Sequence, residues 1–84
     1  MSRFDAMQHF IRVADLGSFA AAADQLGVAR SVVTRRIAAL EEHLGVKLIT
    51  RTTRKLTLTS AGVVYLERCR RILQAIDDAE SEVM

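Results

Sequence analysis

The stretch SFAAAADQLGVARSVVTRRIAALEEHL, at residues 18–44, decides the fold. Its first part, from Phe19 to Leu26, is apolar and rich in alanine, and Gly27 follows it. Ser18 precedes this segment where a helix N-cap is expected, and glycine ends helices because it readily adopts the left-handed conformation. Alanine side chains allow two helix axes to approach closely. The stretch therefore predicts a helix of about two turns that crosses its neighbours in tight contact.

The next helix is predicted from Ala29 to Leu44, and its two faces differ in chemistry. Apolar residues recur at steps of four, three and four and form a stripe of Val33, Ile37, Leu40 and Leu44. The opposite face carries only short or cationic side chains, namely Ser31, Thr34, Arg35 and Ala38, with Arg30 at the start of the helix and Arg36 on its flank. A helix with such a face fits a DNA major groove about 12 Å wide and presents donors to base edges. The pattern therefore favours a helix-turn-helix.

The segments on either side of this pair complete a small domain. A first helix that ends at Leu16 is predicted from an apolar stripe, which consists of Phe4, Met7, Phe10, Ile11 and Ala14. After a stop expected at Gly45, residues 46–51 and 55–59 are rich in β-branched side chains and partly alternate in polarity. They predict a two-stranded hairpin with a basic tip at 52–54, which forms a wing beside the helix-turn-helix.

A final helix is predicted from about Ala61 to the end of the chain, with Thr59 or Ser60 as its cap. Its length is on the order of 35 Å. Apolar side chains step along it in the 4-3-4-3-4 pattern of a two-stranded coiled-coil seam, which comprises Tyr65, Cys69, Ile72, Ile76, Ala79 and Val83. Leu66 and Leu73 point to a second side, which we expect to rest on the domain's own core. The seam predicts a homodimer joined through this helix.

Composition narrows the classes of function. The 84 residues suffice for one small domain, and the formal net charge is only +2, yet residues 30–55 hold seven Lys and Arg against two Glu. Within this basic segment, Arg51, Arg54 and Lys55 lie at or beside the hairpin tip, where DNA phosphates or a minor groove would attract them. The sequence has no Gly-rich phosphate loop and no nucleophile–base pair. An enzyme is therefore the weakest interpretation.

The few potentially reactive side chains have structural interpretations. Cys69 cannot form an internal disulfide, and we expect packing rather than redox chemistry. His9 and His43 lack partners at metal-ligand spacing, so neither a metal site nor a cofactor is expected. Glu41 and Glu42 lie in the C-terminal half of their helix, where local ion pairs are expected. The sequence has no secretion signal and no run of about 18 apolar residues, so we expect a cytoplasmic protein without membrane contact.

An ordered set of short motifs runs along almost the whole chain: FIRVA at 10–14, GSF at 17–19, LGV at 26–28, VTRRI at 33–37, LGVKL at 44–48 and LTSAG at 58–62. With these motifs the chain resembles the N-terminal DNA-binding domain of the bacterial LysR-type transcriptional regulators. The resemblance implies a mainly α winged helix-turn-helix over residues 1–59, followed by a dimerising linker helix over 60–84. It also implies that a small-molecule effector acts only through a domain absent from this chain.

The resemblance further implies which residues meet DNA. It assigns contacts with base edges to Arg30, Ser31, Thr34 and Arg35, on a recognition helix over residues 30–44, and a minor-groove contact to Arg54. For the DNA backbone or minor groove we also expect Arg36 and, in the wing at 47–58, the residues Arg51, Thr52, Thr53 and Lys55. The expected partner is double-stranded DNA with an interrupted palindrome, bound by a homodimer.

The chain departs from the usual family residues at Ala29, Arg30, Ser31, Thr34 and Ile49. Ala29 lacks the hydroxyl that would cap the recognition helix, which leaves Ser31 as the candidate cap. Arg30 replaces an amide and favours guanine, because arginine pairs with the O6 and N7 acceptors of that base. Arg36 has two interpretations, a phosphate contact or an intramolecular pair with a carboxylate.

A second hypothesis is a helical adaptor between proteins that uses the seam at 65–83, with the basic segment as solvated surface only. Such an adaptor would show little salt-dependent affinity for duplex DNA. A DNA reader, in contrast, loses affinity steeply with added salt because its binding releases counterions.

Overall fold

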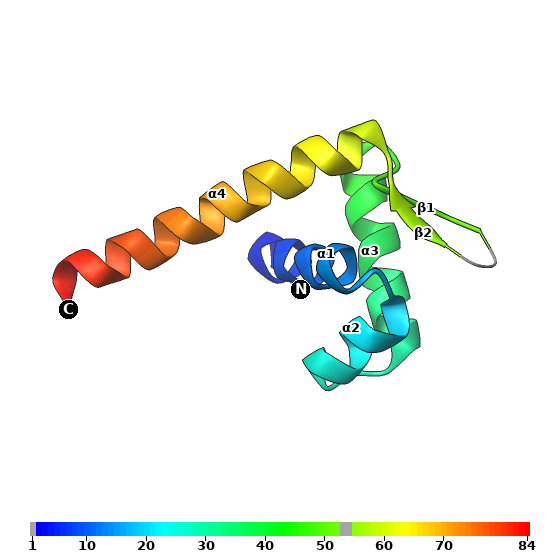
Figure 1. Cartoon of the computed structure of the whole chain (residues 1–84), viewed down its shortest axis with the longest axis horizontal. Helices are drawn as coiled ribbons and strands as arrows, with labels where there is room; N and C mark the ends of the chain where they lie inside the picture. The colour runs from blue at the N-terminus through cyan, green and yellow to red at the C-terminus, as the bar shows by residue number, and fades with distance from the viewer. Residues whose placement is uncertain (1, 53–54) are drawn as a thin grey trace.

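The computed structural model describes residues 2–52 and 55–84, which form four helices and a two-stranded antiparallel sheet. The elements are α1 (Arg3–Leu16), α2 (Phe19–Leu26), α3 (Arg30–Leu44), β1 (Ile49–Arg51), β2 (Leu56–Leu58) and α4 (Ser60–Val83). The predicted mainly α winged helix-turn-helix with a long final helix is confirmed, although each strand has only three residues. Figure 1 shows the C-terminal end of α4 and the hairpin at opposite ends of the molecule. Thr53 and Arg54, both predicted to meet DNA, lie outside the described residues.

Side-chain caps begin the helices where the sequence predicts them, except at α3. The Ser18 hydroxyl oxygen accepts the Ala21 N–H at 3.1 Å, and that of Thr59 accepts the Gly62 N–H at 3.0 Å. Ala29 occupies the N-cap of α3, where no side chain provides a capping bond, so the expectation that Ser31 replaces the missing hydroxyl is wrong.

The first three helices enclose the main core. Phe10, Val13 and Val33 are fully buried in it, together with Ala22. The burial of Ala22 and Ala23 confirms that the alanine-rich segment packs against its neighbours. The turn from α2 to α3 depends on Gly27, whose φ of 70° lies in the left-handed region that other residues adopt at a cost.

Two predicted core residues in terminal helical turns are exposed instead. Leu44, at the end of α3, is 37% exposed and lines a shallow apolar groove with Val46 and Val64. Phe4, in the first turn of α1, is 39% exposed. The helical period identifies the face on which a terminal residue lies, but not whether a neighbouring element reaches far enough to cover it.

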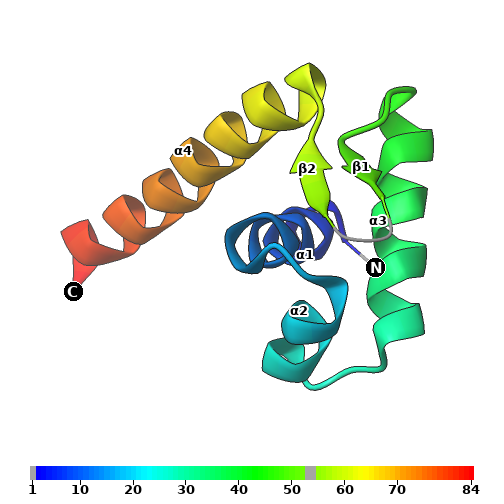
Figure 2. The same ribbon diagram turned by 45° about the vertical axis from the view of Figure 1, so that its right-hand side comes forward.

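α4 packs along α1 through a second apolar cluster. Met7, Ile11 and Cys69 are buried in this cluster, and Leu66 and Leu73 pack against it, as expected for the inner side of the last helix. Tyr65 packs against both clusters, and its ring centroid lies 5.5 Å from that of Phe10. Figure 2 shows how α4 runs from the top of the hairpin past α1 and then beyond it.

The burial of Cys69 corrects the predicted seam. This side chain is 0% exposed within a single chain, so it has no surface for a second chain, and its assignment to a dimer interface is wrong. The 4-3 spacing identified an apolar face of α4 but could not show that α1 covers part of it. Burial raises the pKa of the Cys69 thiol, which keeps it protonated at neutral pH as a packing group. Burial likewise raises the pKa of Tyr65 to about 12.

Polar contacts hold the C-terminal turn of α1 against α4 and α2. Arg70 of α4 donates hydrogen bonds to the Asp15 carboxylate, and Arg12 donates to the same carboxylate at 3.0 Å. Arg12 also donates to the Gln25 side chain of α2 at 3.3 Å. The bond from Arg70 lowers the pKa of Asp15, so the attraction is present above the usual aspartate pKa and is lost as the pH falls through the lowered value.

The start of α4 is in close contact with the segment that leads into β1. A Cβ atom at Gly62 would lie 2.1 Å from the Leu48 carbonyl oxygen. The Thr59 N–H donates to that same oxygen at 3.0 Å, and the Thr59 hydroxyl donates to the Lys47 carbonyl at 2.6 Å. Because the Leu48 side chain is itself buried, this backbone has little room to move, and only glycine fits at position 62.

We expect Gly62→Ala to destabilise the fold by about 1–3 kcal/mol, because the added methyl group overlaps the Leu48 carbonyl. Helix propensity alone predicts the opposite sign, a gain of about 1 kcal/mol. Urea unfolding followed by circular dichroism measures the difference. Ser60→Ala, at an exposed position in the same turn, should change stability by less than about 0.5 kcal/mol. A Gly62→Ala variant as stable as the unmodified chain would contradict the close contact.

Candidate nucleic-acid interface

The outer face of α3 carries the side chains predicted to read bases. Ser31 and Arg35 are exposed, and Thr34 is half-buried between them and the wing. Thr34 donates its hydroxyl proton to the Arg30 carbonyl at 3.1 Å, which leaves its lone pairs and methyl group for other contacts. Among the described residues, no carboxylate forms an ion pair with Arg35. The face therefore offers polar and cationic groups without a bulky apolar side chain, as readout of base edges requires.

A second cationic surface lies between α2, the start of α3 and the hairpin, and we call it the wing groove. It encloses about 260 Å³ and is lined by Ser18, Phe19, Arg30, Arg51, Thr52 and Lys55, among others. The Arg51 guanidinium lies 4.4 Å from the centroid of the Phe19 ring, a cation–π contact that holds it beside the first turn of α2. Three cations beside a helix N-terminus attract a phosphate oxygen.

The wing groove thus brings together three of the four described residues predicted to contact the DNA backbone or minor groove, namely Arg51, Thr52 and Lys55. Thr52 shapes the described start of the hairpin turn: its N–H donates to the Lys55 carbonyl at 2.9 Å, and its hydroxyl oxygen accepts the Lys55 N–H at 3.1 Å. Arg30, predicted to contact a base, lines the wing groove from the first turn of α3. It therefore lies close both to the wing cations and to the outer face of α3.

Of the two predicted roles of Arg36, the structure contradicts the intramolecular pair with a carboxylate, and the phosphate contact stays a prediction. Instead of pairing with a carboxylate, it donates to Nε2 of His9, which lies on α1 and is 9% exposed. Because a guanidinium only donates, Nε2 is the acceptor, and Nδ1 carries the proton that it donates to the Asp5 carbonyl at 2.6 Å. The structural interpretation of His9 is confirmed: it links α3 to α1.

Glu41 has a function that sequence reasoning missed. Its carboxylate accepts the backbone N–H groups of Leu48 at 2.7 Å and Ile49 at 3.2 Å. It also forms the expected type of ion pair, with Lys47 at 3.7 Å, although the Lys47 side chain is 80% exposed and adds little. The charge-assisted bonds to buried backbone groups fasten the hairpin to α3. The one sequence signal was a carboxylate near a helix C-terminus, where the helix dipole disfavours it.

These features define a winged helix-turn-helix whose recognition helix and wing form one polar, cationic surface. Residues 4–63 match the family model described as bacterial regulatory helix-turn-helix protein, lysR family. The chain belongs to this LysR family, which confirms the resemblance seen in its motifs.

Relatives of known name agree with this assignment. The chain is 47% identical over 81 residues to an HTH-type transcriptional repressor of Pseudomonas aeruginosa, which covers 96% of the chain and 26% of the repressor. It is 49% identical over 75 residues to the transcriptional regulator CrgA of Neisseria meningitidis, which covers 89% of the chain and 25% of CrgA. The chain thus spans about a quarter of the length of these curated relatives.

Solved structures match nearly the whole chain. The CbnR DNA-binding domain in complex with DNA has a TM-score of 0.90 and 40% identity, with 98% of this chain and 94% of that one covered. The BenM DNA-binding domain in complex with catB site DNA has a TM-score of 0.91 and 29% identity, with 98% and 92% covered. Within residues 2–52 and 55–84, no helix is long and apolar enough to cross a membrane.

We expect Glu41→Ala to lower the free energy of unfolding by about 2–4 kcal/mol, because two backbone N–H groups of buried residues lose their acceptor. Glu41→Gln keeps one acceptor oxygen and should cost less. Amide hydrogen exchange at Leu48 and Ile49 should accelerate in the alanine variant. Glu42→Ala, at the exposed neighbouring position, is the control, and equal effects at positions 41 and 42 would contradict the role of Glu41.

Proposed function

We propose that this chain is the sequence-specific DNA-binding domain of a bacterial LysR-type transcription regulator. The observation that carries the proposal is the unobstructed outer face of α3 beside a second cationic surface, the wing groove. In this proposal α3 enters the major groove, where Ser31, Thr34 and Arg35 contact base edges. The structural similarity to two DNA-binding domains bound to DNA supports it.

The wing groove would hold the sugar-phosphate backbone next to the site that α3 reads. Arg51 and Lys55 supply charge, and the position of Arg51 is fixed by its contact with Phe19. Arg30 would contact a guanine at the edge of the site, within reach of the same strand. Thr53 and Arg54 would extend this contact towards the minor groove. Phosphate contacts set the register of the protein on the duplex, and base contacts set its specificity.

We further propose that residues 60–84 join two copies of the chain. The outer side of α4 leaves Ile72 48% exposed, Ile76 36% and Val83 86%, and these residues lie on one apolar flank with Ala79. Tyr65 is partly buried against the two core clusters, so only the exposed part of its side chain can contribute to this flank. A homodimer built on this flank would place two copies of α3 on the half-sites of an interrupted palindrome.

The charge pattern of α4 favours an antiparallel pair. Its first half carries Arg68, Arg70 and Arg71, and its second half carries Asp77, Asp78, Glu80 and Glu82. With Ile72 opposite Ile76 of the second copy, position 68 comes opposite position 80, so Arg68 lies only about 3 Å along the axis from Glu82 of that copy, and the reverse holds by symmetry. A parallel pair would place like charges together, which is unfavourable.

The remaining parts of the proposal concern the whole regulator. A ligand-sensing domain beyond this chain would respond to a small-molecule effector, and the protein would act in the bacterial cytoplasm, on the nucleoid when bound. The adaptor hypothesis uses the same flank of α4 but gives the cationic surfaces no function. The salt dependence of DNA affinity separates the two.

In vitro selection from random duplex DNA at near-physiological salt should enrich a motif with two-fold symmetry. Arg35→Ala should then cost about 1–3 kcal/mol of binding free energy at particular base pairs. Arg51→Ala should instead weaken binding to all sequences alike. It should also reduce the salt slope, which is the slope of log affinity against log salt concentration, by about 1. The measurement is fluorescence anisotropy on selected and random duplexes over a series of salt concentrations.

Equal losses on both duplexes for both variants would contradict this division between base and backbone contacts. An unmodified chain that fails to bind duplex DNA at low salt would refute the proposed function and leave the adaptor as the better interpretation. Enrichment of a single half-site would support DNA reading without the dimer.

The antiparallel pair can be tested by disulfide cross-linking. In a chain carrying both Arg68→Cys and Glu82→Cys, mild oxidation on palindromic DNA should produce covalent dimers in high yield. Each single variant should not cross-link, because two copies of position 68 lie about 18 Å apart along an antiparallel pair. Buried Cys69 stays in place in all variants. Efficient cross-linking of the single variants would instead indicate a parallel pair.

A further inference from the structure

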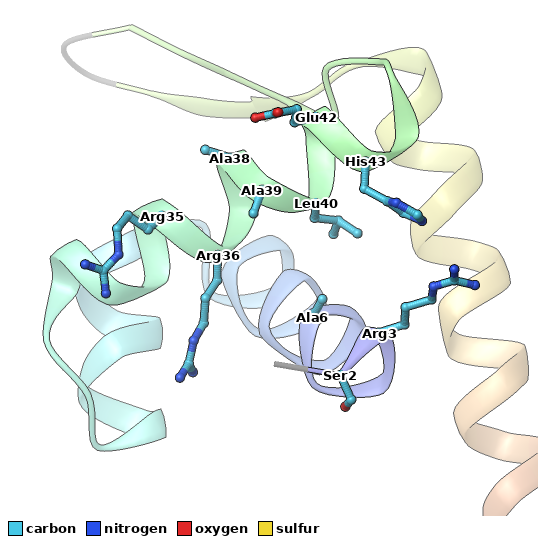
Figure 3. Close-up of a pocket in the computed structure, with 10 residues that line it drawn as sticks. All are labelled: Ser2, Arg3, Ala6, Arg35, Arg36, Ala38, Ala39, Leu40, Glu42 and His43. Carbon is cyan, nitrogen blue, oxygen red and sulfur yellow. The ribbon is translucent and has the colours of Figure 1, made fainter.

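A groove of about 640 Å³ separates the first turns of α1 from the second half of α3, on the side of α3 away from the wing. We call it the α1–α3 groove. Its floor consists of small or apolar side chains, namely Ala6, Ala38, Ala39 and Leu40. Figure 3 shows Arg36 and His43 reaching from α3 towards α1, Arg3 lying on α1 below His43, and Arg35 and Glu42 on the outer side of α3.

The rim of this groove is cationic. Arg3, Arg35 and Arg36 line it together with His43, against the single carboxylate of Glu42. Within residues 2–52 and 55–84, neither Arg3 nor Arg35 forms an ion pair with a carboxylate. Arg36 donates one of its five N–H groups to His9 and retains the others. The groove therefore has donors for an anion and little internal charge to neutralise them.

The groove adjoins the face that the proposed function places in the major groove. Arg35 belongs to both surfaces, and successive residues turn by about 100° around α3, so Ala39 and His43 continue from this face towards α1. A helix in a major groove has a sugar-phosphate strand on each side. With α3 in the major groove as proposed, the wing groove would lie beside one of these strands and the α1–α3 groove beside the other. The exposed methyl groups of Ala38 and Ala39 allow a backbone to approach closely.

We propose that the α1–α3 groove binds the phosphodiester backbone of the DNA strand on the side of α3 opposite the wing. Arg3 makes the phosphate contact from α1, and Arg36, held by His9, makes it from α3. This inference rests on the proposed function and adds α1 to the DNA-binding surface. The charge of the rim excludes cationic partners, and a continuous polyanion that already lies along α3 is the occupant that its position fits.

Two variants test this groove, and a third serves as their control. Arg3→Gln removes a cation from the rim, Ala39→Glu adds a carboxylate to the exposed floor, and Gln8→Glu adds one to the exposed side of α1 outside the groove. Each variant lowers the net charge by one, so long-range electrostatics change equally. Thermal unfolding followed by circular dichroism checks that all three remain folded.

Loss of one phosphate contact should reduce the salt slope by about 0.9, which corresponds to roughly 8-fold weaker binding near 0.1 M salt. We expect this loss for Arg3→Gln and at least as much for Ala39→Glu, equally on selected and random duplexes. Gln8→Glu should change affinity far less. The inference is overturned if the groove variants match Gln8→Glu, or if their losses are confined to the selected sequence. If the proposed function itself is wrong, the result differs from these two outcomes, because the unmodified chain would then show no salt-dependent binding to DNA.

Discussion

The backbone of Leu48 joins three parts of the molecule. Its N–H donates to Glu41 on α3, and its carbonyl accepts the Thr59 N–H just before α4. Gly62 lies directly against this carbonyl, while the Leu48 side chain is 1% exposed in the main core. The wing therefore cannot move relative to α3 without disturbing the start of α4. This junction is stiff because a movement that left the Leu48 N–H or the Leu48 carbonyl without a hydrogen-bond partner would be costly.

This junction explains how a hairpin with three-residue strands keeps its place. An isolated two-stranded hairpin is at best marginally stable in water. Here Ile49 is buried and its N–H is held by Glu41, while Arg51 at the other end of β1 rests on the Phe19 ring. The hairpin is thus attached to α3 at its base and to α2 further along. Its cations keep a fixed position relative to the outer face of α3, so the two surfaces can act as a unit.

The sequence predicted the features that depend on neighbouring residues. Ser18 caps the start of α2 and Gly27 ends it, both through local backbone chemistry. The buried stripe at Val33, Ile37 and Leu40 follows from the helical period. It could not predict contacts between distant segments. Glu41 bonds to residues seven and eight positions further on, across a turn, and nothing in a helical pattern marks it for that role. Cys69 fits a coiled-coil seam by spacing, but spacing identifies a face and not the partner that covers it.

The two faces of α4 link the internal packing to the proposed dimer. Its inner face is fixed on α1 through Cys69 and Leu73, and apolar contacts of this kind tolerate small sliding motions. The hydrogen-bonded pair of Arg70 and Asp15 is directional and fixes the register of α4 along α1. In a dimer joined through α4, that register sets the separation of the two recognition helices. α1 also forms one wall of the α1–α3 groove through Arg3, so its position would affect both the half-site spacing and the proposed contact with the DNA backbone.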